Sequence, residues 1–85
     1  MQPGESVIIR TVTNYFVGRV DSITAGEVKL SDASWVADTG RYSDALTKGG
    51  QVFNDVERLP HGVCVRLGSM VDWSPWKHEL PKETK

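Results

Sequence analysis

The feature that most constrains this chain is a series of short runs in which apolar and polar residues alternate. In the clearest run, 15–24, Phe16 and Val20 fall on one face, while Tyr15 and Val17 fall on the other. Alternation with a period of two, together with many β-branched residues, is typical of half-buried β-strands. Turns of a few residues separate the early runs, which indicates an antiparallel meander. The other expected strands are 6–13, 27–30, 33–37, 63–67 and 70–73.

One segment has the spacing of a helix. Tyr42, Ala45 and Leu46 follow an i, i+3, i+4 pattern, and Gly49 and Gly50 come directly after it. That spacing places three side chains on one helical face, and glycine commonly ends a helix. We therefore predict one short helix around residues 41–48. The next stretch, 51–60, reads as an irregular connection without a strand.

These elements predict a small, mostly-β fold that is an SH3-like or similar antiparallel barrel of five or six strands with one short helix. Two packed sheets are the alternative. The chain has 85 residues, which suits a single domain spanning 1–85. We expect 1–4 and 81–85 to be flexible. A domain of this size has a marginal core, so a partner subunit would help to stabilise it.

Charge and composition argue against several function classes. Ten basic residues nearly balance 11 acidic ones, so no broad positive field exists to attract nucleic acid. The longest apolar stretches have only three residues, and no signal-peptide pattern opens the sequence. A single cysteine, Cys64, excludes an intrachain disulfide. We expect a soluble, cytoplasmic protein with no membrane association.

The segment 35–46 is the first candidate binding site. Thr39, Gly40 and Arg41 precede the expected helix, where free backbone N–H groups and a guanidinium could hold a phosphate or carboxylate. The nearby Trp35 and Tyr42 could stack on a planar ligand. The alternative is purely structural: Asp38 or Thr39 caps the helix, Gly40 adopts a positive φ, and Arg41 pairs with Asp44.

The tryptophans Trp73 and Trp76 form the second candidate. Two tryptophans close together can stack on a planar ligand or anchor an interface. They can equally fill the core. We expect one of them to be in the core and the other to lie at a pocket or an interface.

Catalytic and metal-binding patterns are weak. Cys64, His61 and His78 show no metal-ligand spacing, and no third group can be named to orient a Cys–His pair. We therefore expect neither an enzyme nor a metal or cofactor site.

Several motifs resemble a family of small uncharacterised proteins of bacteriophages and prophages. They are the block W-x-x-D-T-G-R-x-x-D-A-L at 35–46, the segment Tyr15–Val20, and the C-terminal pattern Val71-Asp72 followed by Trp76-x-His78-x-Leu80-Pro81. The similarity covers most of the chain and fits poorly at 51–60. Because that family has no assigned function, the resemblance implies a phage origin and no site residues.

These observations together favour a phage-encoded, non-catalytic protein that forms a homo-oligomer in the host cytoplasm. It would counter host defence by sequestering a nucleotide-like anionic signal or by blocking a defence protein. Its expected ligand-binding residues are Trp35, Thr39, Gly40, Arg41, Tyr42, Trp73 and Trp76. A virion structural or decoration component is one alternative, and a single-stranded nucleic-acid-binding barrel is another.

Overall fold

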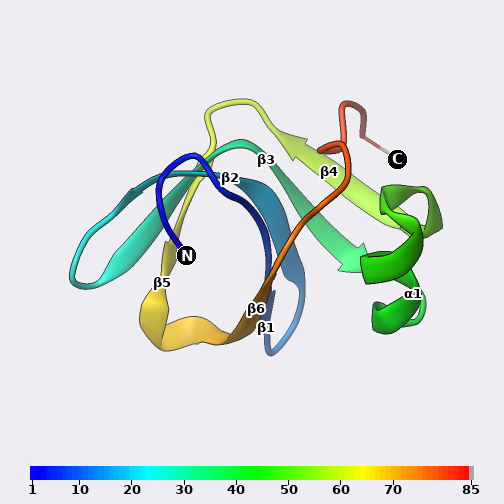
Figure 1. Ribbon diagram of the computed structural model, residues 1–85, viewed down its shortest axis with the longest axis horizontal. Helices are drawn as coiled ribbons and strands as arrows, with labels where there is room; N and C mark the ends of the chain where they lie inside the picture. The colour runs from blue at the N-terminus through cyan, green and yellow to red at the C-terminus, as the bar shows by residue number, and fades with distance from the viewer. Residues whose placement is uncertain (85) are drawn as a thin grey trace.

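The computed structural model describes residues 1–84, which form one six-stranded antiparallel sheet and one short α-helix (Figure 1). This confirms the predicted mostly-β, barrel-like fold and the helix near 41–48. The strands are β1 (Ser6–Thr11), β2 (Tyr15–Ile23), β3 (Glu27–Asp38), β4 (Asp55–Leu59), β5 (Val63–Arg66) and β6 (Met70–Pro75). The helix is α1 (Tyr42–Lys48), and two 3-10 turns are η1 (Gly50–Val52) and η2 (Leu67–Ser69).

The long strand β3 organises the sheet because it pairs with two different strands along one edge. The strand order is β4-β3-β2-β1-β6, and β5 pairs with the first half of β3, next to β4. Asp32, with a φ of 47°, marks the bend between the two halves. Its carboxylate pairs with Arg19 of β2. The chain then curls through β5 and η2 back to β6 beside β1 (Figure 1).

Several expected boundaries differ from the structure. Segment 51–60 contains β4 and the end of η1 rather than an irregular connection. Runs 27–30 and 33–37, expected as two strands that are paired or strongly bent, belong to one bent strand, and the expected strands 6–13 and 63–67 end earlier, at Thr11 and Arg66. The sequence pattern did not predict β4, because Val56 is the only buried residue of this strand and three of its five residues are charged. The last strand continues to Pro75, which pairs with Val7. Proline is tolerated at the margin of an edge strand because no ladder N–H is required there.

The side chains on both faces of β1 are buried, which explains why this strand contains a continuous apolar run. Val7, Ile8 and Ile9 are all 0 % exposed. The inner core lies inside the curl of the sheet and consists of Val7, Ile9, Val20, Val28, Leu30, Ala33 and Val65. The helix-side core lies beneath α1 and η1 and consists of Ile8, Val17, Val36, Ala45, Phe53, Val56 and Trp76. A strand with buried side chains on both faces reads as a continuous hydrophobic run.

Both ends of the described chain make backbone contacts. The Gly4 N–H donates to the Val20 carbonyl at 2.8 Å, and the Arg58 N–H donates to Thr84 Oγ1 at 3.1 Å. The expected flexible segments 1–4 and 81–85 therefore include residues that touch the sheet, and residue 85 lies outside the described residues. The chain after β6 passes α1 on its way to β4 (Figure 1).

Candidate functional site

One row of apolar side chains crosses the sheet. The register pairs Trp73 with Ile9, Ile9 with Phe16, and Phe16 with Trp35. Residues directly opposite each other on neighbouring strands point to the same face. Ile9 is completely buried, whereas the three aromatic side chains are half-buried. We call Trp73, Ile9, Phe16 and Trp35 the apolar row; they lie on the face of the inner core.

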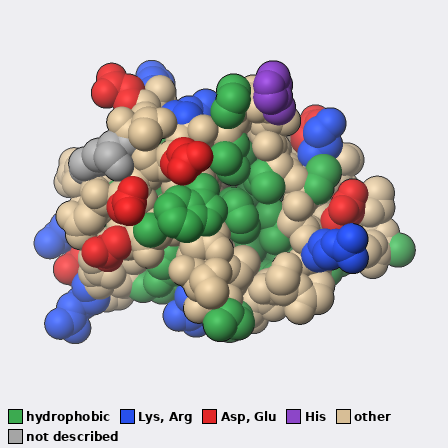
Figure 2. Space-filling model, turned by 180° about the vertical axis from the view of Figure 1, so that it is seen from behind, with side chains coloured by type: hydrophobic (Ala, Val, Ile, Leu, Met, Phe, Trp, Pro, Cys, Tyr) green, Lys and Arg blue, Asp and Glu red, His purple; other side chains and the backbone are tan. Residues whose placement is uncertain are grey.

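Acidic residues border the apolar row at β4. Glu57 is directly opposite Trp35, and Asp55 is directly opposite Asp38. Because side chains alternate along a strand, Asp55 and Glu57 project from the same face of β4. All three carboxylate residues are exposed. Figure 2 shows hydrophobic side chains gathered at the centre of one face of the molecule, with acidic side chains beside them. We call Asp38, Asp55 and Glu57 the acidic border.

The Thr39–Arg41 corner is largely occupied by its own hydrogen bonds. The Gly40 N–H donates to Asp38 Oδ1 at 2.7 Å, and the Thr39 hydroxyl donates to the Gly40 carbonyl at 3.0 Å. Thr39 is 1 % exposed, and Gly40 has a φ of +66°. Arg41 is exposed at the N-cap of α1, where no side chain caps the helix. Within residues 1–84, no ion pair joins Arg41 to Asp44, so the pairing named in the structural alternative is not formed.

Tyr42 packs against the sheet on the helix side. Its ring stacks on Tyr15 with a centroid distance of 5.5 Å, and the Arg10 guanidinium lies 5.2 Å from the ring centroid. Arg10 also donates to the Asp72 carboxylate through Nε, at 3.0 Å, and through Nη2. The hydrogen bond from Arg10 to Asp72, followed by the charge of Asp72, raises the pKa of Arg10. The Tyr42 hydroxyl is buried without a hydrogen-bond partner among residues 1–84. These contacts hold Tyr42 in a packing position.

Trp73 and Trp76 point to opposite faces of the sheet. Trp76 is 3 % exposed and stacks on Phe53 at 5.4 Å between ring centroids. Its Nε1–H donates to the Glu79 carbonyl at 3.0 Å. Trp73 packs half-buried against the inner core. The two rings therefore cannot enclose one ligand within a single chain.

The seven residues expected to bind a ligand consequently lie in three places. Trp35 and Trp73 belong to the apolar row, and Trp76 belongs to the helix-side core. The remaining four, at 39–42, lie at the start of α1. Sequence reasoning missed the acidic border, because the proximity of Glu57 to Trp35 depends on the unpredicted strand β4.

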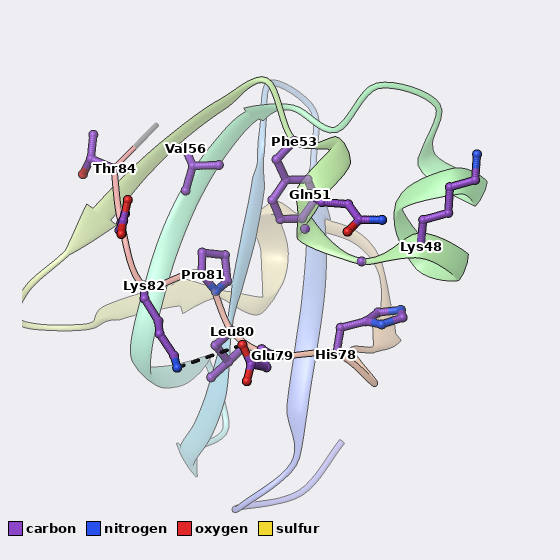
Figure 3. Close-up of a pocket in the computed structure, with 13 residues that line it drawn as sticks. Lys48, Gln51, Phe53, Val56, His78, Glu79, Leu80, Pro81, Lys82 and Thr84 are labelled. Carbon is purple, nitrogen blue, oxygen red and sulfur yellow. Dashed lines mark ion pairs between the residues drawn. The ribbon is translucent and has the colours of Figure 1, made fainter.

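Sequence reasoning also missed a pocket of about 490 Å³ between η1, β4 and the C-terminal segment (Figure 3). Its apolar side chains come from Phe53, Val56, Leu80 and Pro81. His78 also lines the pocket, and its Nε2 lies 2.8 Å from the Leu46 carbonyl oxygen. Two lysines and two glutamates line it, Lys48, Lys82, Glu79 and Glu83, so their formal charges cancel. The C-terminal Trp-x-His-x-Leu-Pro pattern was the one sequence signal for this pocket.

Reactive side chains are dispersed. Within residues 1–84, no three His, Cys, Asp or Glu side chains lie close enough together to hold a metal ion. Cys64 is a free, exposed cysteine on β5, opposite Lys29 of β3.

Among residues 1–84, no helix is long and apolar enough to cross a membrane. No protein-family model, curated protein or solved structure matches this chain.

Proposed function

We propose that this chain is a phage-encoded, non-catalytic binding protein that counters host defence by blocking a defence protein in the host cytoplasm. The observation that carries the proposal is the apolar row, which leaves three aromatic side chains only partly buried on one sheet face. Aromatic side chains are enriched at the centres of protein interfaces, where they contribute much of the binding energy. The phage origin rests on the family resemblance.

The charges around Trp35 favour a protein partner over a nucleotide-like signal. Glu57 is directly opposite Trp35 on the same face, and Asp55 follows on that face of β4. A phosphate placed on Trp35 would approach these carboxylates and be repelled. The guanidinium expected to hold the phosphate, Arg41, lies at the start of α1 rather than in the apolar row. Single-stranded nucleic acid is disfavoured for the same electrostatic reason.

The first test is capture of a defined partner by the wild-type protein and a Trp35→Ala variant. The wild-type protein should bind a defence protein whose inhibition protects the phage. The affinity of the Trp35→Ala variant for the same defence protein should be about 30-fold or more lower, as expected for an interface hot spot. Calorimetry would measure both affinities. Glu27→Ala, an exposed change on the part of β3 that pairs with β5, is the matched control and should bind like wild type.

Three results, from this test and from two further experiments, would contradict the proposal. If Trp35→Ala retains both partner affinity and protection, the apolar row is not the blocking surface. If instead the protein is a stoichiometric component of purified particles, the virion alternative replaces it. A retained nucleotide-derived mass in native mass spectrometry would favour the sequestering alternative.

We also propose that the protein is a homo-oligomer that pairs through the free edge of β6. Within residues 1–84, β6 pairs only with β1, so its other edge offers unpaired backbone groups. Val71 on β6 is 56 % exposed, and Val12 in the adjoining turn is 88 % exposed. The edge of β4 is partly covered, because Thr84 accepts the Arg58 N–H. An uncovered strand edge with apolar neighbours is a template for pairing with another chain.

Val71→Lys should convert the oligomer into a monomer, because a lysine on an edge strand opposes edge-to-edge pairing. Light scattering coupled to size-exclusion chromatography would give the molar mass of both proteins. Ile23→Lys is the control, since Ile23 is also exposed, at 40 %, but ends β2. A wild-type protein that remains monomeric up to about 100 μM would contradict the proposal.

A further inference from the structure

We infer that Trp35 and the acidic border form a site for a positively charged side chain, a guanidinium or an ammonium, presented by the protein partner. The inference rests on the proposed function and assigns the chemistry of the group that contacts Trp35. It follows from the strand register, from the pattern of charge on this face and from the direction in which the basic residue of β4 projects.

The register places a carboxylate and two aromatic rings side by side. Trp35 is flanked directly by Phe16 on β2 and by Glu57 on β4. Side chains directly opposite each other in an antiparallel pair have Cβ atoms about 5 Å apart. A cation above the face of the Trp35 ring is attracted by the ring quadrupole. The same cation would lie within reach of the Glu57 carboxylate, so both interactions would act on one group.

The end of the β3–β4 pair adds negative charge on the same face. Asp38 and Asp55 are register partners just after a register shift between Val36 and Asp38, and like charges at partner positions destabilise a sheet. Asp38 accepts hydrogen bonds from the Gly40 N–H at 2.7 Å and from Asn54 Nδ2 at 3.4 Å. Within residues 1–84, Asp55 and Glu57 take part in none of the five ion pairs. A cationic partner would remove the resulting repulsion.

The basic residue of β4 itself does not neutralise this face. Arg58 is paired with Ser34, one position away from the Glu57–Trp35 pair, and therefore projects from the opposite face. Its Nη1 donates to the Ala33 carbonyl at 3.1 Å and to Ser34 Oγ at 3.0 Å. Within residues 1–84, no ion pair includes Asp38, Asp55 or Glu57, so we expect another molecule to supply the charge complement of the acidic border. Complementary charge of this kind directs partner choice and association rate.

The test uses nuclear magnetic resonance of the whole chain, in which each of the three tryptophans contributes one indole N–H signal. The signals are assigned with Trp→Phe variants. The probe is an acetylated, amidated Gly-Arg-Gly-Arg-Gly peptide, and the reference probe replaces both arginines with glutamine. The arginine peptide should shift the Trp35 signal in a saturable manner with millimolar affinity, the range of a single weak contact. The signals of Trp73 and buried Trp76 should stay unchanged.

Glu57→Gln should weaken binding of the arginine peptide about 3-fold or more, because the substitution removes the charge and keeps the shape. Glu27→Gln removes an equal charge from the β5-paired part of β3 and should leave binding unchanged. Raising the salt concentration should weaken the wild-type interaction. The inference is overturned if the glutamine peptide binds as well as the arginine peptide, or if Glu57→Gln binds like wild type.

The results of these experiments distinguish a failure of the inference from a failure of the proposed function. A Trp35 signal that changes with protein concentration instead of peptide would show that a second copy covers the face, and it would overturn the inference. Loss of partner binding in Trp35→Ala without arginine-peptide binding would overturn the inference and leave the blocking function standing. Arginine-peptide binding with full protection by Trp35→Ala would overturn only the function.

Discussion

Trp76→Ala is expected to lower the free energy of unfolding by about 3–5 kcal/mol, the usual cost of truncating a large buried aromatic residue. Trp76 is 3 % exposed, stacks on Phe53 and donates its Nε1–H to the Glu79 carbonyl. Its removal would leave a cavity beneath η1 and release the segment that follows β6. Small domains have total stabilities at the lower end of about 5–15 kcal/mol, so the variant should be largely unfolded near physiological temperature.

Urea denaturation followed by far-ultraviolet circular dichroism would measure this loss without depending on tryptophan fluorescence. Trp35→Ala is the matched control, because the same side chain is removed from a half-buried position. It should cost about 1 kcal/mol, within the range of changes that create no buried cavity. Equal destabilisation by the two variants would contradict the assignment of Trp76 to the helix-side core and of Trp35 to the surface.

Gly62→Ala is expected to destabilise the protein by about 3 kcal/mol or more, because two separate costs combine. Gly62 has a φ of +73°, which side-chain-bearing residues rarely adopt. A Cβ atom at this position would also lie 2.4 Å from the Leu30 carbonyl oxygen. Backbone cannot move aside as a flexible side chain can, so β5 would have to shift away from β3.

Two other glycines separate these costs. Gly4 has a φ of +89°, and a Cβ atom added there would meet nothing within 4 Å, so Gly4→Ala should show only the backbone cost of about 1 kcal/mol. Gly26 has neither a positive φ nor a close neighbour, so Gly26→Ala should be near neutral. Thermal unfolding should rank Gly62→Ala far below Gly4→Ala in melting temperature. Equal values for these two variants would contradict the close approach of the β4–β5 turn to Leu30.

The amino-acid sequence by itself determined the local elements. Alternation identified the runs that form β2 and β5, since half-buried strands need an apolar residue at every second position. A run of β-branched residues identified β1. The Tyr42, Ala45 and Leu46 spacing with Gly49 behind it located α1, which ends at Lys48 with Gly49 at a φ of 91°. A glycine inside an alternating run, such as Gly18, is typical of a bulge or a close backbone approach. A Cβ at Gly18 would lie 3.1 Å from the Ser31 carbonyl oxygen, so β2 and β3 approach each other closely there.

Only the tertiary structure decided which side chains share a surface. β4 carries charge at three of its five positions, and its strand conformation depends on pairing with β3, a partner distant in sequence. That pairing brings Glu57 beside Trp35. The odd separation of Trp73 and Trp76 already places their side chains on opposite faces, and only the packing of Trp76 on Phe53 decided which of the two is buried. Local patterns encode the period of a strand, whereas the register between strands comes from long-range packing, and the candidate site is a product of that register.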